Sequence, residues 1–349
     1  MTMPPKKPNI LVVRLGLLGD MVCTTPMLAA IKRHFPEGRL CLLSNAYNRP
    51  VVARNPFVDK IYTYIHTRNR QRNPRPGFFA SMIDAWRLKR DLQRERFDWI
   101  VVCNGGFNKP SVRIAQHLGG KIISATRENG SYEYRVDYPI SGLLAEPIEH
   151  EVARTFRLLA PFGIGMDAVP AHLTLTADSG VIAKVRAHLQ PTGPLPNVAI
   201  HISARDPRRE WPVARFAALI REIHQTLPAN FWVIHAPDDD LRAKALSLEI
   251  AGIAHTLISP KSTDALIATL ALATLVICQE GGISHMAAGL QVPVVGLFEN
   301  TPEKLQGWYP WGCPHRLVTN PAPMGLIKDI AATDVAAAAL DLYKEVQPI

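Results

Sequence analysis

The chain has 349 residues, of which 47% are apolar and 20% are charged, and its pI is near 9.4. This composition excludes a chain that is mostly disordered, and the length predicts two domains. No stretch approaches 18 consecutive apolar residues, which argues against a transmembrane helix, and the polar start at Met1–Pro8 leads into a strand rather than a signal peptide.

Cysteine usage points to the cytoplasm. The chain has an odd number of cysteines, and they are widely spaced and mostly lie inside apolar runs: Cys23, Cys41, Cys103, Cys278 and Cys313. We therefore expect reduced thiols, with neither a disulfide framework nor a metal cluster.

Most of the net charge of +9 is concentrated in one segment. Between Arg49 and Arg96 there are 12 Lys or Arg against 4 Asp or Glu. Such a basic surface attracts nucleic acid, anionic lipid or a phosphorylated sugar. Nucleic acid is the weakest of these, because the nearby aromatic residues form no RNA-binding motif. The alternative is a solvated loop followed by an ordinary amphipathic helix.

In the first half of the chain, short apolar strands alternate with helices. Strands are predicted at 9–14, 40–44, 58–64, 98–103 and 121–124, and helices after the turn at 15–20, at 80–96 and at 112–118. The strands are nearly continuous apolar runs, which is typical of parallel sheets covered by helices on both faces.

The pattern then restarts. Helices are predicted at 150–162 and 177–190, and the Pro/Gly-rich stretch at 190–196 suits a boundary. A second series has strands at 197–201, 231–235, 275–278 and 292–298, and helices at 213–226, 241–250, 263–273, 284–289 and 331–346. We therefore predict an α/β chain of two Rossmann-like, doubly wound domains, residues 1–175 and 176–349. They would face a central cleft, and the last helix could pack back on the first domain.

The first candidate site is the turn Arg14–Val22, between the first strand and the first helix. Its glycines allow a tight turn and close approach of the backbone to a ligand. Asp20 falls at the helix start, where it is either an N-cap or a carboxylate at the mouth of the cleft. The turn lacks the G-x-G-x-x-G spacing, which argues against a nicotinamide-dependent oxidoreductase.

The second candidate is the loop His201–Pro212, which contains Ser203, Arg208 and Arg209. Arginine offers fixed paired donors, so the loop suits a phosphate group; the alternative is an exposed basic loop. The Trp-Pro pair at its end is expected to pin the loop to the domain and to start the next helix at Pro212.

The third candidate is Cys278–Ala288, where a strand ends, Gly281 and Gly282 turn the chain, and a helix begins near Ser284. Backbone N–H groups at that helix start form a site for a diphosphate. Glu280 can accept hydrogen bonds from sugar hydroxyls. His285 is either a phosphate contact or a packed helix histidine.

Several catalytic motifs are absent from the sequence. There is no P-loop, no H-E-x-x-H and no nucleophile elbow, which argues against an ATPase, a zinc hydrolase and an esterase. The D-x-D pattern within Asp238–Asp240 looks like the capped start of a helix. A catalytic metal is therefore not implied.

Together these motifs resemble glycosyltransferase family 9, the ADP-heptose:lipopolysaccharide heptosyltransferases, over nearly the whole chain. The matching landmarks are Gly19-Asp20, Thr25-Pro26, Lys32, His150–Arg154, Leu158-Leu159, Gly163, Arg208–Pro212, Gly282–Ala288, Pro293–Phe298 and Thr301-Pro302.

The resemblance implies a GT-B fold, with the acceptor in residues 1–175 and the nucleotide-sugar in residues 176–349. It implies inverting, metal-independent transfer of heptose from ADP-L-glycero-β-D-manno-heptose to a lipopolysaccharide core sugar, without a cofactor. The implied roles are general base for Asp20, donor diphosphate for Ser203, Arg208, Arg209, Gly281, Gly282 and His285, donor sugar for Glu280, and donor nucleoside for Asp239 and Lys261.

The chain departs from the family at three of these positions. It has Glu280 where the family usually has Asp, Gly281 where the family has Ser or Thr, and Glu210 where the family often has a basic residue. Because the glutamate is one methylene longer, its contact to the sugar must shift or differ. The identity of the donor sugar therefore stays open.

The basic segment fits an acceptor that bears phosphates in the inner leaflet of the membrane, held by Arg68, Arg70 and Arg72. Attachment to the anionic inner-membrane surface would be peripheral, helped by Phe78 and Phe79. One alternative is a family member that moves another sugar or modifies another glycan or a protein. The other is a non-catalytic nucleotide-sugar-binding protein, against which Asp20 argues.

Overall fold

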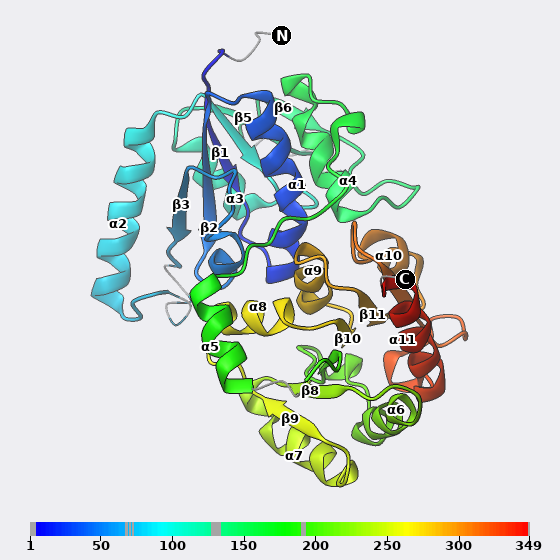
Figure 1. The fold of residues 1–349 in the computed structure, drawn as a ribbon. Helices are drawn as coiled ribbons and strands as arrows, with labels where there is room; N and C mark the ends of the chain where they lie inside the picture. Colours follow the sequence, from blue (N-terminus) through cyan, green and yellow to red (C-terminus); the bar gives the residue numbers. More distant parts are fainter. Residues whose placement is uncertain are drawn as a thin grey trace. The chain divides into compact units, whose positions relative to one another are not determined.

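The computed structural model describes residues 5–66, 69, 71, 73–126, 134–189 and 193–347. The chain divides into two compact units, Met1–Thr174 and Leu175–Ile349. Each unit is built on one six-stranded sheet in which every pair of neighbouring strands is parallel (Figure 1). The predicted α/β class with two doubly wound sheets is confirmed.

Unit 1 has the strand order β3-β2-β1-β4-β5-β6. Its strands are β1 (Asn9–Val13), β2 (Arg39–Asn45), β3 (Lys60–Tyr64), β4 (Trp99–Val102), β5 (Lys121–Ala125) and β6 (Tyr138–Ile140). Its helices are α1 (Leu18–His34), α2 (Phe78–Glu95), α3 (Lys109–Gln116) and α4 (Glu151–Phe156).

The central strands of unit 1 are buried on both faces, as their continuous apolar runs predict. Leu11 and Val13 of β1 share one core cluster with residues of α2 and α3, including Leu92 and Val112. The alternate residues of β1 point to the opposite face of the sheet and are equally buried. Helix α1 is buried along most of its length and packs against α4.

Unit 2 has the strand order β12-β11-β10-β7-β8-β9. Its strands are β7 (Asn197–His201), β8 (Asn230–Ile234), β9 (His255–Ile258), β10 (Leu275–Gln279), β11 (Val294–Leu297) and β12 (His315–Val318). Its helices are α5 (Ser179–Leu189), α6 (Val213–Thr226), α7 (Asp240–Glu249), α8 (Thr263–Ala271), α9 (Gly282–Gly289), α10 (Pro302–Gly307) and α11 (Ala332–Val346).

The C-terminal helix α11 packs within unit 2, against α6 and strands β10, β11 and β12. Its buried residues Val335, Ala336, Ala339 and Leu342 belong to the same core cluster as Phe216 of α6. Among the residues that the structure describes, no helix is both long enough and apolar enough to cross a bilayer.

The structure corrects some predicted boundaries. The single helix expected at 150–162 is α4 followed by a 3-10 helix over Arg157–Phe162, which contains Pro161. Strands β6, β9 and β12 were not predicted. All three are short strands at an edge of their sheet, and most of their side chains are only half-buried.

Candidate functional site

The first candidate site lies where the strand order of unit 1 reverses. Chain order runs outward from β1 to β3 on one side and from β4 to β6 on the other, so the segments that follow β1 and β4 leave the same edge of the sheet. In parallel α/β sheets this switch point is where ligands bind. The turn that carries Asp20 follows β1, and the Gly105-Gly106 turn follows β4.

Asp20 is the third residue of α1 and is not its N-cap, which is Leu17. Its Oδ2 accepts a hydrogen bond from the Leu17 N–H at 2.7 Å, which satisfies one of the free donors at the helix start. A Cβ at Gly16 would lie 2.2 Å from Oδ2, so a larger residue there would displace the Asp20 carboxylate. The side chain keeps 23% of its surface exposed. Asp20 therefore stabilises the helix start from its third position and still presents a carboxylate to solvent.

Behind Asp20 lies a buried group of charged residues. Arg14 follows β1, and its side chain is 3% exposed. It donates to the carbonyl of Cys103 at 2.6 Å and to Glu151 Oε1 at 2.6 Å, and its Nη2 lies 3.7 Å from Asp20 Oδ1. Glu151 Oε2 in turn accepts from Arg154 at 2.8 Å. We call Asp20, Arg14, Glu151 and Arg154 the unit 1 charge cluster.

This cluster is electrostatically balanced. Burial opposes the charge on Arg14, but Glu151, Cys103 and Asp20 together more than offset it and raise the pKa of Arg14 above its usual range. Arg14 therefore stays cationic beside Asp20. A Cβ at Gly105 would lie 2.6 Å from Glu151 Oε2, so the turn after β4 also makes room for a carboxylate.

The segment His150–Arg154 builds its part of the cluster through a helix start. His150 is the N-cap of α4, and its Nδ1 accepts from the Val152 N–H at 3.1 Å. Capping at His150 makes Glu151 the first residue of the helix and places Arg154 one turn further on. Both charged side chains can then meet at the same point, which accounts for this landmark of the sequence.

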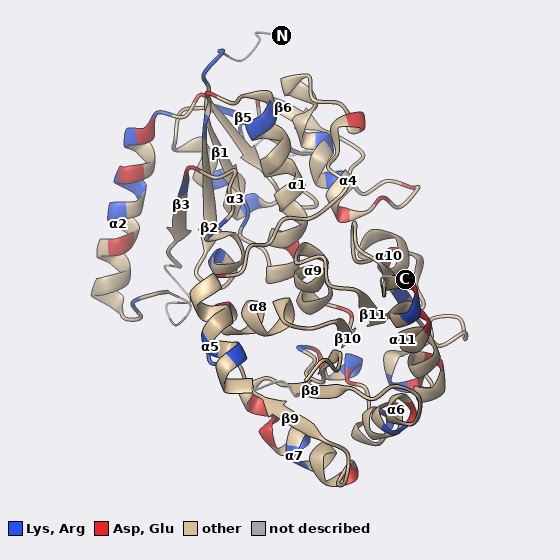
Figure 2. Ribbon diagram, in the orientation of Figure 1, with Lys and Arg blue, Asp and Glu red and all other residues tan. Residues whose placement is uncertain are grey.

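The second candidate site lies at the corresponding switch point of unit 2, between β7 and β10. The loop after β7 carries Ser203, Arg208 and Arg209, and the turn after β10 carries Glu280, Gly281 and Gly282. Adjacent parallel strands thus bring the second and third candidate motifs to one edge of the sheet, although the two motifs are distant in sequence. Figure 2 shows the charged residues on these elements.

The two arginines of the loop after β7 differ in their surroundings. Arg208 is 85% exposed and is held by Asp206, to which its Nε donates at 3.0 Å and its Nη2 at 2.6 Å. These hydrogen bonds lower the pKa of Asp206 to about 2. Arg209 is 31% exposed, and its Nε lies 3.1 Å from Glu280 Oε1. Arg209 is therefore the more buried and more constrained of the two.

Glu280 is 5% exposed and is shared by two cations. Besides Arg209, Lys304 Nζ lies 3.6 Å from the same oxygen. Burial raises the pKa of Glu280, against the influence of both cations. The longer side chain of this glutamate is thus occupied by ion pairs at the end of β10.

Ser203 also makes a contact within unit 2, since its Oγ accepts from the Ala236 N–H at 2.7 Å. Its hydroxyl proton can still be donated. The prediction for the Trp-Pro pair is confirmed: Trp211 is fully buried, its Nε1 donates to the Ile330 carbonyl at 3.0 Å, and Pro212 is the N-cap of α6. The loop is therefore anchored at its far end.

Helix α9 begins two residues earlier than predicted, at Gly282, with Gly281 as its N-cap. Gly281 has φ +148°, a backbone conformation that other residues rarely adopt, and a Cβ there would meet no atom within 4 Å. The open space beside a helix start suits an anion. His285 is 2% exposed and packs edge-on against Trp308, at 5.9 Å between ring centroids. This position matches the packed-histidine alternative.

The predicted nucleoside contacts follow the next strands. Asp239 is the half-buried N-cap of α7, after β8, and Lys261 is exposed in the loop after β9. Sequence reasoning did not single out His201 at the end of β7. Burial lowers its pKa to about 4, with His235 and Arg242 adding to the effect and Asp239 opposing it. His201 is therefore neutral near pH 7.

An open pocket of about 560 Å³ adjoins the loop after β7. Its lining includes three cations, Arg208, Arg209 and Lys328, and three carboxylates, Asp206, Glu210 and Glu299. Glu210, which stands where the family often has a basic residue, also lines it and lies 3.5 Å from Arg242. Lys304, Lys328 and Arg242 were not predicted, because none of them stands inside one of the three candidate motifs.

The proposed acceptor residues Arg68, Arg70 and Arg72 lie outside the described residues. Within the part of the chain that is described, no three His, Cys, Asp or Glu side chains are grouped so as to hold a metal ion. All five cysteines are buried.

Comparison with known proteins places these observations in a family. Residues 85–324 match the family model for glycosyltransferase family 9 (heptosyltransferase). The chain is 25% identical over 301 residues to lipopolysaccharide heptosyltransferase 3 of Escherichia coli, covering 84% of this chain and 83% of the relative.

Two solved structures share the fold. A glycosyl transferase family 9 protein from Veillonella parvula superposes with a TM-score of 0.81 at 16% identity, covering 97% of each chain. The Escherichia coli heptosyltransferase WaaC with ADP superposes with a TM-score of 0.71 at 17% identity, covering 96% of this chain and 99% of WaaC.

Proposed function

This chain belongs to glycosyltransferase family 9, and from that premise we propose that it transfers heptose from ADP-L-glycero-β-D-manno-heptose to a sugar of the lipopolysaccharide core. That the chain is a glycosyltransferase follows from the family and from its heptosyltransferase relatives. The sugar, the acceptor and the mechanism are the proposal.

The observation that carries the proposal is the arrangement around Asp20. Inverting transfer needs a base that removes the proton from the acceptor hydroxyl. Asp20 is a partly exposed carboxylate at the switch point of unit 1, and its Oδ2 is already oriented by the Leu17 N–H.

Unit 2 offers what the leaving diphosphate requires. Negative charge grows on the diphosphate as the glycosidic bond breaks, and fixed donors stabilise it. Arg209 is held by Glu280 through its Nε side, which leaves its other guanidinium N–H groups able to donate to phosphate. The start of α9 at Gly281 and Gly282 adds backbone N–H groups.

These cations and backbone donors can replace a metal ion at the leaving group. We therefore expect transfer to continue in excess EDTA. Loss of activity that Mg²⁺ restores would contradict a metal-independent mechanism.

The position of Glu280 favours a second candidate, transfer of a different sugar by the same machinery. Its carboxylate is buried and paired with Arg209 and Lys304, so it is less available to sugar hydroxyls than an open aspartate would be. A panel of nucleotide-sugars, tested with lipopolysaccharide acceptors truncated at each core step, distinguishes the two. Turnover of only a non-heptose donor would replace heptose in the proposal.

The role of Asp20 is tested by Asp20→Asn. The amide oxygen can still accept from the Leu17 N–H, so the helix start is kept, but the side chain no longer accepts a proton. We expect kcat to fall roughly 10²–10⁴-fold, the usual span for loss of a general base, with ADP affinity little changed. Near-native turnover would reduce Asp20 to its capping role.

We further infer that the protein works on the cytoplasmic side of the inner membrane, as a peripheral protein. The acceptor proposed here is a glycolipid of the inner leaflet. The cation excess between Arg49 and Arg96 suits its phosphates and the anionic lipids around it.

A further inference from the structure

Helix α2 of unit 1 carries a group of large apolar side chains that are exposed. Five large side chains on it have exposed fractions of 48% or more: Phe78, Phe79, Met82, Ile83 and Trp86. Phe79 is 78% exposed and Trp86 is 60% exposed. Their spacing of three, four and seven residues puts them on one side of the helix. We call these five residues the α2 apolar face.

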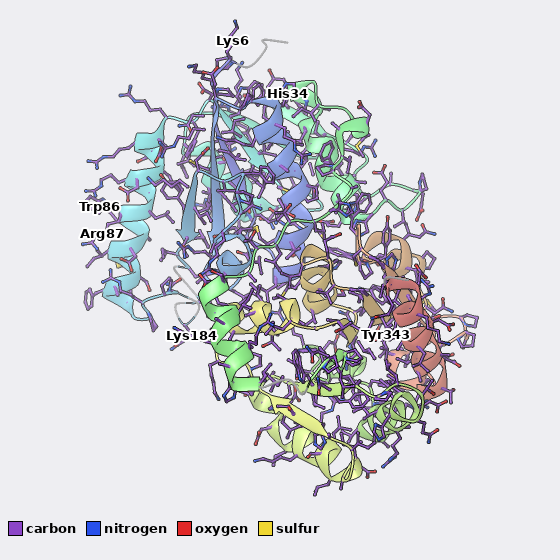
Figure 3. All side chains as sticks on the ribbon, viewed as in Figure 1. Lys6, His34, Trp86, Arg87, Lys184 and Tyr343 are labelled. Atoms are coloured by element: carbon purple, nitrogen blue, oxygen red, sulfur yellow. The ribbon has the colours of Figure 1, made fainter. Side chains whose placement is uncertain are left out.

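The inward side of α2 is a different set of residues. Ser81 and Leu92 are its buried positions. Ala85, Leu88 and Leu92 line a small apolar pocket of about 190 Å³ together with Leu43 of β2. In Figure 3 Trp86 and Arg87 point away from the sheet of unit 1. The helix is thus attached along one narrow side, and its aromatic side chains are directed to solvent.

Basic side chains follow the α2 apolar face on the exposed side of the helix. Arg90 lies one turn after Trp86, with its guanidinium carbon 4.7 Å from the Trp86 ring centroid, and Arg94 lies one turn further on the same side. Aromatic and basic side chains together are the combination that favours the headgroup region of a bilayer.

The acidic residues of α2 do not oppose this. Asp84, Asp91 and Glu95 follow a different row of the helix, at spacings of seven and four. Asp84 is paired with Arg75, Asp91 Oδ1 lies 3.7 Å from Arg90 Nε, and Glu95 is paired with Lys60 at 2.8 Å. Each acidic side chain thus has a cation beside it, and the segment from Arg49 to Arg96 as a whole has 12 Lys or Arg against 4 Asp or Glu.

We propose that α2 is the membrane-docking element of this protein and lies in the headgroup region of an anionic bilayer. The α2 apolar face enters the boundary between headgroups and acyl chains, and Arg90 and Arg94 contact lipid phosphates. The inference deepens the proposed function, because it rests on a membrane-anchored acceptor for its biological purpose. The binding itself does not depend on catalysis.

The charge of the segment favours a bilayer over a second copy of the chain. A symmetric dimer through this face would bring the same cation excess against itself, which is repulsive. Binding to an anionic surface is instead stabilised by about 1 kcal/mol for each basic residue near that surface.

The test is co-sedimentation of the full chain with vesicles of phosphatidylglycerol and phosphatidylethanolamine, across a salt series. Phe79→Gln with Trp86→Gln should lower the partition coefficient roughly tenfold or more, since both side chains lose apolar surface buried in the interface. Both residues are largely exposed, so the melting temperature should be unchanged. Binding of the unmodified chain should weaken as salt rises.

A matched control exists on α7 of unit 2. Leu241 and Leu248 are 82% and 79% exposed, as much as the two aromatic residues, but lie on a helix without an aromatic face. Leu241→Gln with Leu248→Gln should leave vesicle binding unchanged. Equal losses in the two double variants, or no loss in either, would overturn the proposal.

Brominated lipid gives an independent measure. Bromine near the acyl boundary should quench part of the tryptophan fluorescence of the unmodified chain. Trp86→Phe should bind vesicles nearly as well but lose most of this quenching. Unchanged quenching in Trp86→Phe would mean that α2 does not enter the bilayer. If the Phe79 and Trp86 substitutions abolish dimerisation instead of vesicle binding, the face is a protein contact and the proposal fails. A chain that binds vesicles but transfers no sugar would contradict only the proposed function.

Discussion

At the residue scale, the carboxylate of Glu151 holds two buried arginines. It accepts from Arg14 and from Arg154, and its own side chain is 2% exposed. Removing one partner of a buried ion pair leaves the other charge desolvated, which costs far more than an exposed pair contributes. The unit 1 charge cluster therefore makes unit 1 sensitive to this one position.

We predict that Glu151→Gln lowers the free energy of unfolding by about 3 kcal/mol. Glutamine can still accept one hydrogen bond, but it cannot balance two guanidinium groups. Denaturant unfolding followed by circular dichroism measures the change.

Glu149→Gln is the matched control, because Glu149 pairs with Arg157 at 3.0 Å in a partly exposed position only two residues away. Loss of that pair should cost less than about 1 kcal/mol. Similar costs for the two variants would show that burial does not amplify the cluster.

His201 predicts a pH dependence of stability. Its pKa is lowered to about 4 in the folded chain, from 6.5 as the ordinary value. Between these values the unfolded chain binds a proton at this site and the folded chain does not, so stability falls as the pH drops. The contribution is fully present above pH 6.5 and is lost progressively toward pH 4.

The change over this window is about 3 kcal/mol, from 1.36 kcal/mol per pKa unit. His201→Gln removes this proton-linked part, so its unfolding free energy should fall less steeply between pH 6.5 and pH 4 than that of the unmodified chain. Other acidic groups titrate in both proteins and cancel in the comparison. Parallel curves would mean that His201 is protonated at the same pH in both states.

At the element scale, the loop between β7 and α6 is fixed at both ends and charged in the middle. Trp211 anchors the loop by donating a hydrogen bond to the Ile330 carbonyl, and Ser203 Oγ accepts a hydrogen bond from the Ala236 N–H. Between these points Arg209 is oriented by the buried Glu280, whereas Arg208 is held by its neighbour Asp206 in an exposed position. The more constrained arginine loses less entropy when it binds a ligand.

We therefore predict that Arg209→Ala weakens ADP binding by about 1.5–3 kcal/mol, the scale of a charge-assisted hydrogen bond. Arg208→Ala should cost less than half of that. Isothermal titration calorimetry of both single variants and of the double variant gives the comparison. Unchanged ADP binding in the double variant would mean that the loop is solvated and does not contact ADP.

Sequence patterns identified the elements that are buried on both faces. The central strands are continuous apolar runs, and helices such as α3 and α6 have apolar residues at helical spacing. The edge strands β6, β9 and β12 escaped prediction because they have only three or four residues, and half-exposed positions weaken so short an apolar signal. The edge strand β3 has five residues and was predicted.

The same limit applies to the sites. Asp20 and the Gly281-Gly282 turn stand in local motifs, so a sequence of one chain can point to them. The pairing of Arg14 with Glu151 joins residues 137 positions apart, and only the folded sheet brings them together. The ion pair between Arg209 and Glu280 was hidden for the same reason, although both residues were singled out separately.

At the scale of the whole molecule, the division of the chain into two units predicts that donor binding and the candidate base belong to different units. Each unit has its own sheet, its own core and its own switch point. The candidate donor residues all lie in Leu175–Ile349, and the candidate base lies in Met1–Thr174. If this assignment holds, ADP alone should protect unit 2 and leave unit 1 largely unaffected.

Hydrogen exchange of the full chain, followed by mass spectrometry, tests this division. At an ADP concentration of about 100 times Kd, bound ligand adds about 2.7 kcal/mol to the stability of the structure that binds it. Amides that exchange only by opening of the binding site should therefore slow by roughly a hundredfold.

We expect that slowing at 203–210, 236–240 and 280–285, where the loops after β7, β8 and β10 lie. Peptides covering 14–24 and α2 should exchange at the same rate with and without ADP. Adenosine without phosphates serves as the control, since it cannot engage Arg209 or the start of α9. Protection that appears equally in 14–24 would contradict the assignment of the donor to unit 2. Protection by adenosine as strong as that by ADP would mean that contacts to the diphosphate do not contribute to binding.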